Sequence, residues 1–242
     1  MYRSVYELKA FYASQPGRLV RRLLSGHMHQ IWPDLTGTRV MGYGYAVPYL
    51  RSLGEHAERS FAVMPAGRGV HQWPEGEPNR VCIASEGELP IETESIDRIL
   101  MVHALENVES PQVLLHEMWR VLKSNGRLLM VVPSRMGLWA RADWTPFGHG
   151  TPYTTHQINH YLQECLFVHE RTEKALYMPP FRSFFFMRTA FALESVGRYV
   201  FPGLAGLHLI EASKQVYAGA GHKQAVGAGA RRYAAIQTVP TS

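Results

Sequence analysis

Cysteine is scarce in this chain of 242 residues. Cys82 and Cys165 are its two cysteines, and they lie far apart, without the close spacing of a metal-binding motif. A cytosolic chain usually keeps such thiols reduced and buried, so we assign them no chemistry.

An apolar run long enough to cross a membrane is also missing. The most apolar segment, residues 181–207, is interrupted by Arg182, Arg188, Glu194 and Arg198. A span requires roughly 20 nearly unbroken apolar residues. We therefore expect this segment to pack on its own domain, or against a protein partner or a second copy of the chain.

The N-terminal region lacks the pattern of a signal peptide. Glu7, Lys9 and Arg18 are mixed into its apolar positions, so no basic zone is followed by an apolar zone and a small-residue zone. The sequence therefore predicts a cytoplasmic protein with no membrane span.

A continuous basic surface is not indicated either, although the formal net charge is +5. Residues 1–40 carry a net charge of +4 and the residues after Glu211 carry another +4, which leaves −3 for the rest of the chain. Nucleic-acid binding requires positive charge gathered on one face of the folded part. Nucleic acid is therefore not an expected partner.

The central part of the chain alternates short apolar runs with helical patterns. We expect strands at residues 39–41, 61–64, 81–84, 99–102 and 128–132. A helix should begin after Ser110 as N-cap, with Pro111 in its first turn, and end near Gly126. This alternation predicts an α/β fold with a doubly wound, mostly parallel, Rossmann-like sheet.

The ends of the chain differ from this centre, and we divide the sequence into four parts. Residues 1–38 should form N-terminal helices, and residues 39–133 should form the core with the sheet. Residues 134–217, rich in Trp, Gly and Pro at their start, should form a lid after the fifth strand and the closing strands of the same domain. The Gly/Ala-rich residues 218–242 should be a disordered tail.

A glycine turn and a set of short motifs carry a family resemblance. "RVMGYGYAVPYL" has Gly42 and Gly44 between a strand and a helix, where backbone can approach a ligand closely. Downstream stand "SE" and "LP", then "SID" before a strand, "LEN" after it, and "RVLKSNG". In this spacing, residues 38–133 closely resemble class I S-adenosylmethionine-dependent methyltransferases of type 11. "FYAS" and "YAVPYL" are also similar to bacterial members of that group.

The resemblance implies S-adenosylmethionine as cofactor and assigns positions to it. Gly42 and Gly44 match the first two family glycines, Ala46 replaces the third, Glu86 matches the acid on the adenine amino group, and His103 lies near the methionine end. The expected cofactor-binding positions are Gly42, Tyr43, Gly44, Ala46, Met64, Glu86, Leu89 and His103.

Two acids of the family pattern are absent from the glycine turn and from the second strand. Val40 stands two residues before the first glycine, and Met64 stands near the position of the acid that grips the ribose. A hydrogen bond to a charged group contributes roughly 1.5–3 kcal/mol, so we expect cofactor affinity to be weakened roughly 10- to 100-fold. Tyr43, Tyr45 and Trp73 are aromatic groups that can compensate by stacking or by facing the sulfonium, or can serve as packing.

Methyl transfer requires alignment, exclusion of water and removal of a proton where the acceptor carries one. His103 is the candidate catalytic base. His149, His156 and Tyr153 are further candidates, with capping, surface or core roles as alternatives. His156 and His160 are spaced i, i+4, but no third ligand stands at metal-site spacing, so no metal is expected.

Two functional classes remain open from the sequence. The first is a methyltransferase with a weakened cofactor site, acting on a small molecule or a protein, its acceptor pocket roofed by Trp139, Trp144 and the "TPFGHG" loop. The second is a non-catalytic protein of the same fold that acts as an interaction partner or regulator through residues 181–207.

Overall fold

The computed structural model of the chain describes residues 4–180, 190–200 and 203–215. At its centre is a seven-stranded sheet with the strand order β3-β2-β1-β4-β5-β7-β6. The first five strands are parallel, and β7 is antiparallel to both β5 and β6. The strands are β1 (Arg39–Gly44), β2 (Arg59–Pro65), β3 (Val81–Ala84), β4 (Ile96–Val102), β5 (Leu122–Pro133), β6 (Phe167–Ala175) and β7 (Leu207–Lys214).

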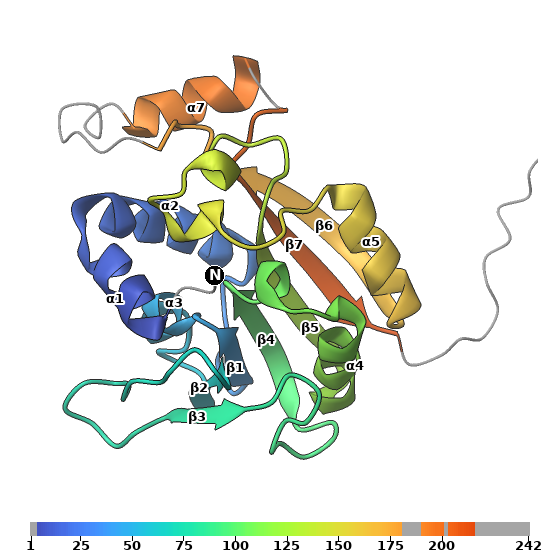
Figure 1. Cartoon of the computed structure of the whole chain (residues 1–242). Helices are drawn as coiled ribbons and strands as arrows, with labels where there is room; N and C mark the ends of the chain where they lie inside the picture. The colour runs from blue at the N-terminus through green and yellow to red at the C-terminus, as the bar shows by residue number, and fades with distance from the viewer. Residues whose placement is uncertain (1–3, 181–189, 201–202, 216–242) are drawn as a thin grey trace, which may run out of the picture.

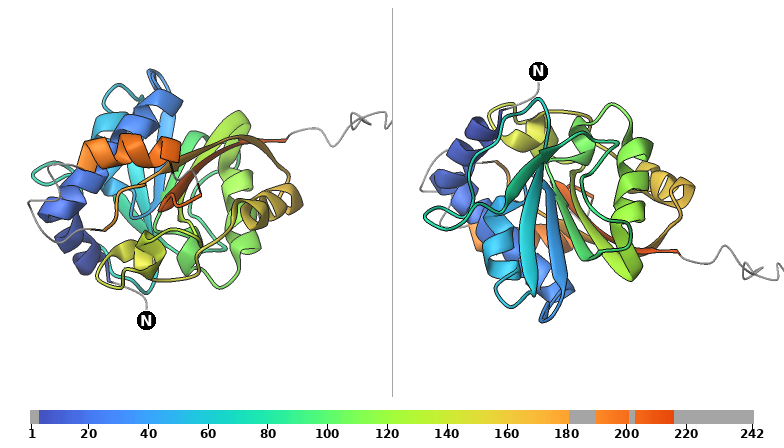
Figure 2. Two further views of the ribbon diagram at one scale, coloured as in Figure 1. Left: turned by 90° about the horizontal axis from the view of Figure 1, so that it is seen from above. Right: turned by 90° about the horizontal axis from the view of Figure 1, so that it is seen from below.

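Helices cover both faces of this sheet, as Figures 1 and 2 show. One face carries α1 (Val5–Ala13), α2 (Gln15–Ile31) and α3 (Val47–Leu53), and the other carries α4 (Pro111–Val121) and α5 (Thr155–Glu164). Each face has its own cluster of buried apolar side chains. The α/β, doubly wound and mostly parallel architecture predicted from the sequence is confirmed.

The two N-terminal helices meet at Ser14, which is the C-cap of one and the N-cap of the other. Ser14 ends α1, and its side chain accepts the backbone N–H of Gly17 in the first turn of α2. A Cβ at Gly17 would overlap the Phe11 carbonyl group, so only glycine allows this close approach. The amphipathic α2 then buries Val20, Leu23, Leu24, Met28 and Ile31 at helical spacing.

The helix predicted from Ser110 to near Gly126 is shorter than expected. It ends at Val121, and the chain enters β5 at once because Leu122 pairs with Ile96 on β4. The pairing then resumes between Arg98 and Arg127 after an irregularity. Ser110 stands at the N-cap position but makes no capping hydrogen bond with its side chain. Strand pairing therefore overrides the helical pattern of residues 122–126.

The C-terminal third contains η2 (Trp139–Arg141), η3 (Pro146–Gly148) and α7 (Ala190–Val200). Helix α7 is held by Glu194, whose carboxylate accepts the backbone N–H groups of Leu176, Tyr177 and Met178. Residues 181–189 and 201–202 of the apolar segment, and the predicted tail from 218, lie outside the described residues. Among the described helices, none combines the length and the apolar character needed to cross a membrane.

His208 on β7 makes stability depend on pH. The side chain is buried, and burial together with the Lys174 charge lowers its pKa to about 4, from about 6.5 for a free histidine. Between these values the unfolded chain binds a proton that the folded chain does not, so folding stability falls as pH drops through that window. The total loss should be about 3 kcal/mol.

We expect the variant His208→Asn to lose less stability than the wild type between pH 7 and pH 4. Urea unfolding at several pH values gives the slope of the unfolding free energy against pH. A packing loss that is the same at every pH does not change this slope. His156→Asn, at an exposed position, is the control and should keep the wild-type slope. Equal slopes for all three proteins would contradict the assignment.

Candidate functional site

The glycine turn lies at the carboxyl edge of the sheet, between β1 and α3. Gly44 has a φ of +80°, and a Cβ there would overlap the Val102 carbonyl oxygen at the end of β4. The Tyr45 N–H donates to this same oxygen at 2.7 Å. A Cβ at Gly42 would lie 2.6 Å from Leu50 and 2.8 Å from Ala46, which is itself buried. Both glycines are thus required by contacts within the chain.

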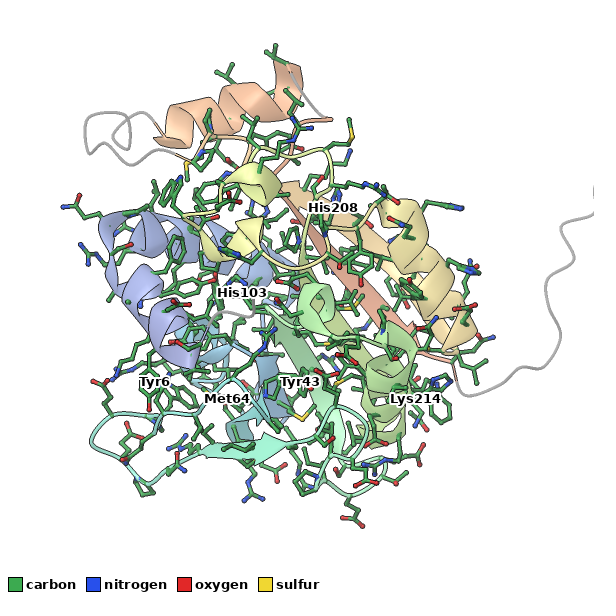
Figure 3. All side chains as sticks on the ribbon, viewed as in Figure 1. Tyr6, Tyr43, Met64, His103, His208 and Lys214 are labelled. Carbon is green, nitrogen blue, oxygen red and sulfur yellow. The ribbon has the colours of Figure 1, made fainter. Side chains whose placement is uncertain are left out.

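The two positions that lack acids belong to the core. Val40 and Met64 are both fully buried and pack in the cluster between the sheet and the N-terminal helices. Figure 3 labels Met64 near the end of β2, where its partner in the pairing is Ile83 of β3. At the end of β2, where the family resemblance predicts a contact to the ribose, the side chain is therefore apolar and buried.

Polar groups gather where β3 ends. Glu86 is partly exposed, and burial raises the pKa of its carboxyl group although the Arg68 charge opposes this. The buried hydroxyl of Tyr43 has no hydrogen-bond partner in the described part of the chain, and burial followed by the Glu86 charge raises its pKa. Leu89 is buried, and its N–H donates to the Glu117 carboxylate.

His103 follows β4 directly and has an unusual backbone. Its φ of +51° lies in the left-handed region, which non-glycine residues rarely adopt outside turns and functional sites. Its carbonyl oxygen accepts Arg68 Nη1 at 3.0 Å and Asn107 Nδ2 at 3.3 Å. Asn107 thus helps to fix the turn. Figure 3 places His103 between α1 and the ends of the central strands.

Four polar side chains form a line through His103. Tyr49 donates its hydroxyl to Tyr12 at 3.0 Å, and Tyr12 lies 2.9 Å from His103 Nε2. With Tyr12 accepting from Tyr49, its own proton is available to Nε2, and in that tautomer the ring proton is on Nδ1. Nδ1 lies 3.4 Å from Glu106 Oε1, at ion-pair distance. Nδ1 and both Glu106 carboxylate oxygens make no hydrogen bond in the described part of the chain. The carboxylate therefore lies beside the imidazole on one side, and the Tyr12 phenol contacts it on the other.

Aromatic rings close the space above this line. The Tyr12 ring stacks on Tyr45 at 5.8 Å between ring centroids and meets Tyr49 edge-on, and Phe147 lies 4.7 Å from His103. Tyr12 is 5% exposed, His103 is 1% exposed and Phe147 is 2% exposed. Helix α1 is thus seated on the carboxyl edge of the sheet, and its side chains fill the position above the glycine turn and His103.

The structure brings Gly42, Gly44, Ala46 and His103 together at this edge, with Tyr43, Glu86 and Leu89 beside them. Three further residues contact His103 that the sequence motifs did not indicate: Tyr12 from α1, Arg68 from the loop after β2, and Glu106 from η1 (Leu105–Asn107). The available signals were "FYAS" for Tyr12 and "LEN" for Glu106. Neither motif shows by itself which element its side chain will meet.

The other candidates make structural contacts and do not contact the His103 side chain directly. Trp139 is buried and donates to the Met178 carbonyl oxygen, the Tyr153 hydroxyl donates to Leu105, and His149 contacts the Asp143 carbonyl oxygen. Trp73 and Trp144 pack against the cluster on the α1 face, and Tyr45 stacks on Tyr12. His160 pairs with Glu164, and the described residues contain no cluster of three or more metal-ligating groups.

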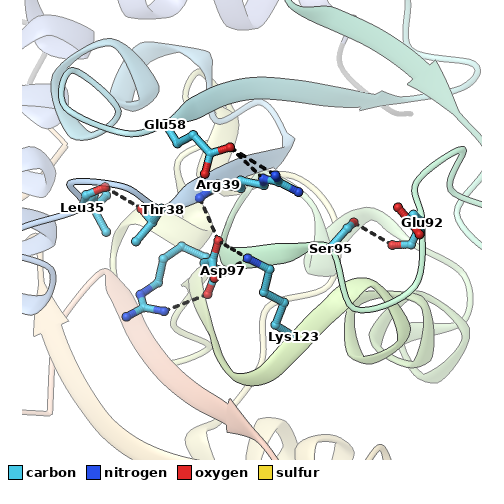
Figure 4. Close-up of polar contacts among 9 residues, drawn as sticks. Leu35, Thr38, Arg39, Glu58, Glu92, Ser95, Asp97 and Lys123 are labelled. Carbon is cyan, nitrogen blue, oxygen red and sulfur yellow. Dashed lines mark hydrogen bonds and ion pairs between the residues drawn. The ribbon is translucent and has the colours of Figure 1, made fainter.

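A cavity of about 770 Å³ lies at the opposite, amino edge of the sheet. It is lined at the starts of the strands by residues that include Arg39, Glu58 and Ser95. Figure 4 shows their contacts: Arg39 pairs with Glu58, and Asp97 accepts both the Arg39 backbone N–H and the Lys123 ammonium group. These pairs satisfy one another, so the cavity presents no converging unpaired charge from them.

Comparisons with known proteins agree with this architecture. Residues 40–130 match the family model described as a methyltransferase domain. No curated protein sequence matches the chain. Among solved structures, a complex of the Haloferax volcanii Trm112 methyltransferase activator with a methyltransferase matches with a TM-score of 0.62 and 17% identity, over 89% of this chain and 100% of the other.

Two further solved structures are similar. An S-adenosylmethionine-dependent methyltransferase from Mesorhizobium loti matches with a TM-score of 0.57 and 15% identity, over 78% of this chain and 96% of the other. A SAM-dependent methyltransferase from Archaeoglobus fulgidus matches with a TM-score of 0.57 and 16% identity, over 80% and 94% respectively. At these identities the structures support the fold.

We expect Met64→Glu to destabilise the protein instead of restoring a ribose contact. Met64 is fully buried, and a carboxyl group kept neutral there at pH 7 costs about 4 kcal/mol of unfolding free energy. Met64→Leu, which conserves volume, should cost less than about 1.5 kcal/mol. Denaturant unfolding of both variants measures this. A Met64→Glu protein as stable as wild type would place this side chain at an open site.

Proposed function

We propose that this chain, whose residues 40–130 match the methyltransferase-domain family model, is a class I S-adenosylmethionine-dependent methyltransferase with a weakened cofactor site, and that the structure has this site in a closed conformation. The observation that carries the proposal is His103. It stands at the carboxyl edge of the sheet beside Gly44, with Nδ1 at 3.4 Å from the buried Glu106 carboxylate and Nε2 at 2.9 Å from the Tyr12 hydroxyl. This is the arrangement of an oriented general base.

The cofactor fits the site in part. Tyr43, with an unsatisfied buried hydroxyl, and the partly exposed Glu86 offer polar atoms for the adenine end. The methionine end would have to lie above Gly44 and His103, where the Tyr12 and Phe147 rings are packed. Arg68 also crosses to the His103 carbonyl oxygen. Cofactor binding in this position therefore requires α1 to move.

The bound cofactor would supply a methyl group already activated on a sulfonium. His103 Nε2 would hold the proton that an acceptor releases, and Glu106 would stabilise the resulting imidazolium through Nδ1. Water would be excluded by Phe147 and by the loop at Gly150, which packs on the Glu106 carbonyl group and the Asn107 side chain. The acceptor is a small molecule or a protein, and the protein is expected in the cytoplasm.

A second candidate function is a non-catalytic methyltransferase-fold protein that acts as an interaction partner or regulator. The filled crevice favours it, because Gly42, Gly44 and the Tyr45 N–H are all engaged within the chain. Helix α7 offers a surface for a partner or a second copy, with Val196 at 55%, Tyr199 at 86% and Val200 at 57% exposure. One of the similar structures is itself a complex with an activator protein.

Calorimetry with S-adenosylhomocysteine separates the two functions. We expect a dissociation constant of roughly tens to hundreds of micromolar, because the charged ribose contact is missing and α1 must be displaced. Glu86→Gln should weaken binding about tenfold by removing a charged acceptor. Glu88→Gln, two residues away and exposed, should bind as the wild type does.

Each other outcome of the titration is informative. Sub-micromolar binding would contradict the weakened site, and equal binding by Glu86→Gln would remove Glu86 from the cofactor contacts. A folded wild-type protein that binds nothing at millimolar ligand would support the non-catalytic function. Gly44→Val is unsuitable as a test, because its Cβ would collide with Val102 and destabilise the fold itself.

A further inference from the structure

We propose that the place held by the Tyr12 ring is a binding slot for a phenolic ligand, which α1 fills with its own phenol until such a ligand displaces it. This inference rests on the proposed function and names the chemical class of its acceptor. It depends on the groups around Tyr12, which form a site complementary to a ring with one hydroxyl.

The walls of the slot are aromatic. Tyr45 stacks on the Tyr12 ring with 29° between the planes, and Tyr49 meets it edge-on at 86°. The His103 ring approaches at 5.8 Å between centroids. These residues belong to the β1 turn, to α3 and to the end of β4, so they remain in place when α1 moves. Flat apolar walls of this kind bind an aromatic ring by area and by ring geometry.

The end of the slot selects a hydroxyl group. Tyr49 donates to the oxygen of Tyr12 and His103 Nε2 accepts its proton, at 3.0 Å and 2.9 Å. A phenol supplies one acceptor and one donor and satisfies both partners. Benzene would leave both buried groups without a partner, and a carboxylate has no proton for Nε2. The slot therefore discriminates by hydrogen bonding as well as by shape.

Outside the slot, α1 is held by exposed polar contacts, by the Val5 N–H, which donates to the Arg68 carbonyl oxygen at 3.0 Å, and by buried apolar side chains. Its nine residues are too few for a helix that is stable alone in water. Lys9 pairs with Glu75 through side chains that are 48% and 77% exposed, and Tyr6 donates to Val70 at a long 3.4 Å. Exposed pairs of this kind contribute little. The buried Val5, Leu8 and Phe11 still favour the closed state, so wild-type affinity for a phenol should be low.

The closed state also leaves the polar groups behind the slot incompletely satisfied. Neither carboxylate oxygen of Glu106 has a hydrogen bond in the described part of the chain, although the side chain is 1% exposed. Such a group is costly when it only supports packing. Its place behind His103 is consistent with a site that acts on the group facing Nε2, where Tyr12 now lies.

The first test is rescue of a cavity variant. Tyr12→Ala removes the phenol and retains the Cβ, so added phenol should restore the ring and both hydrogen bonds. We expect phenol to raise the melting temperature of Tyr12→Ala and to bind at least about tenfold more tightly than benzene. Tyr6→Ala, on the same helix at a 64% exposed position, should show neither effect. Equal binding of phenol and benzene would overturn the proposal.

The second test uses the wild-type protein and decides the question if Tyr12→Ala does not fold. Amide hydrogen exchange within residues 5–13 should accelerate at least several-fold in millimolar p-cresol, and toluene at the same concentration should have no effect. Exchange in α4 should not change. Unchanged exchange of α1 in p-cresol would show that the Tyr12 slot is structural, which overturns the proposal. Neither test contains the cofactor. A negative result in either test therefore leaves the prediction for S-adenosylhomocysteine binding unchanged.

Discussion

The approach of the Gly44 backbone to the end of β4 is the contact on which the site depends. No side chain fits between Gly44 and the Val102 carbonyl oxygen, and the Tyr45 N–H bonds this oxygen. The chain at the end of β4 therefore turns sharply, and His103 takes a left-handed conformation held by Arg68 and Asn107. This turn sets the direction of the imidazole. Tyr12 on α1 contacts the imidazole, so the position of α1 depends on the same turn.

Glycine has a different use here from the one its motif indicates. In a cofactor-binding turn, glycine keeps space for the ligand. In this chain Gly42 and Gly44 keep space for Leu50, Ala46 and Val102. The two uses do not exclude each other, because close packing of the turn also fixes the edge against which a ligand would lie. The position of α1 then decides whether that edge is open.

The sequence was sufficient for the fold because its signals are local. Residues 81–84 were predicted as a strand with the bounds that the structure has, and α5 begins after Thr154 through a capping box with Gln157. The end of α4 was missed because Leu122 pairs with Ile96, a contact that no helical periodicity contains.

The site was less predictable, since its partners are distant in sequence. The motifs placed Gly44 and His103 at one edge of the sheet, because both follow parallel neighbouring strands. Tyr12 reaches His103 across 91 residues and Arg68 reaches it across 35. Tyr12 also stands outside the residues 38–133 that carry the resemblance. Predicting that α1 closes the site would have required knowledge of how a nine-residue helix docks.

Glu106 distinguishes a functional site around His103 from a region that is only packed core. Replacing a buried charged pair with apolar side chains of similar size is often neutral or stabilising, so packing alone gives no reason for Glu106 beside His103. Tyr12, Tyr49 and Phe147 would stack equally well beside an apolar residue. A carboxylate at 3.4 Å from Nδ1 has its effect when His103 takes up a proton, because it then faces a cation. That event requires a proton donor at Nε2, which is the place that Tyr12 now occupies.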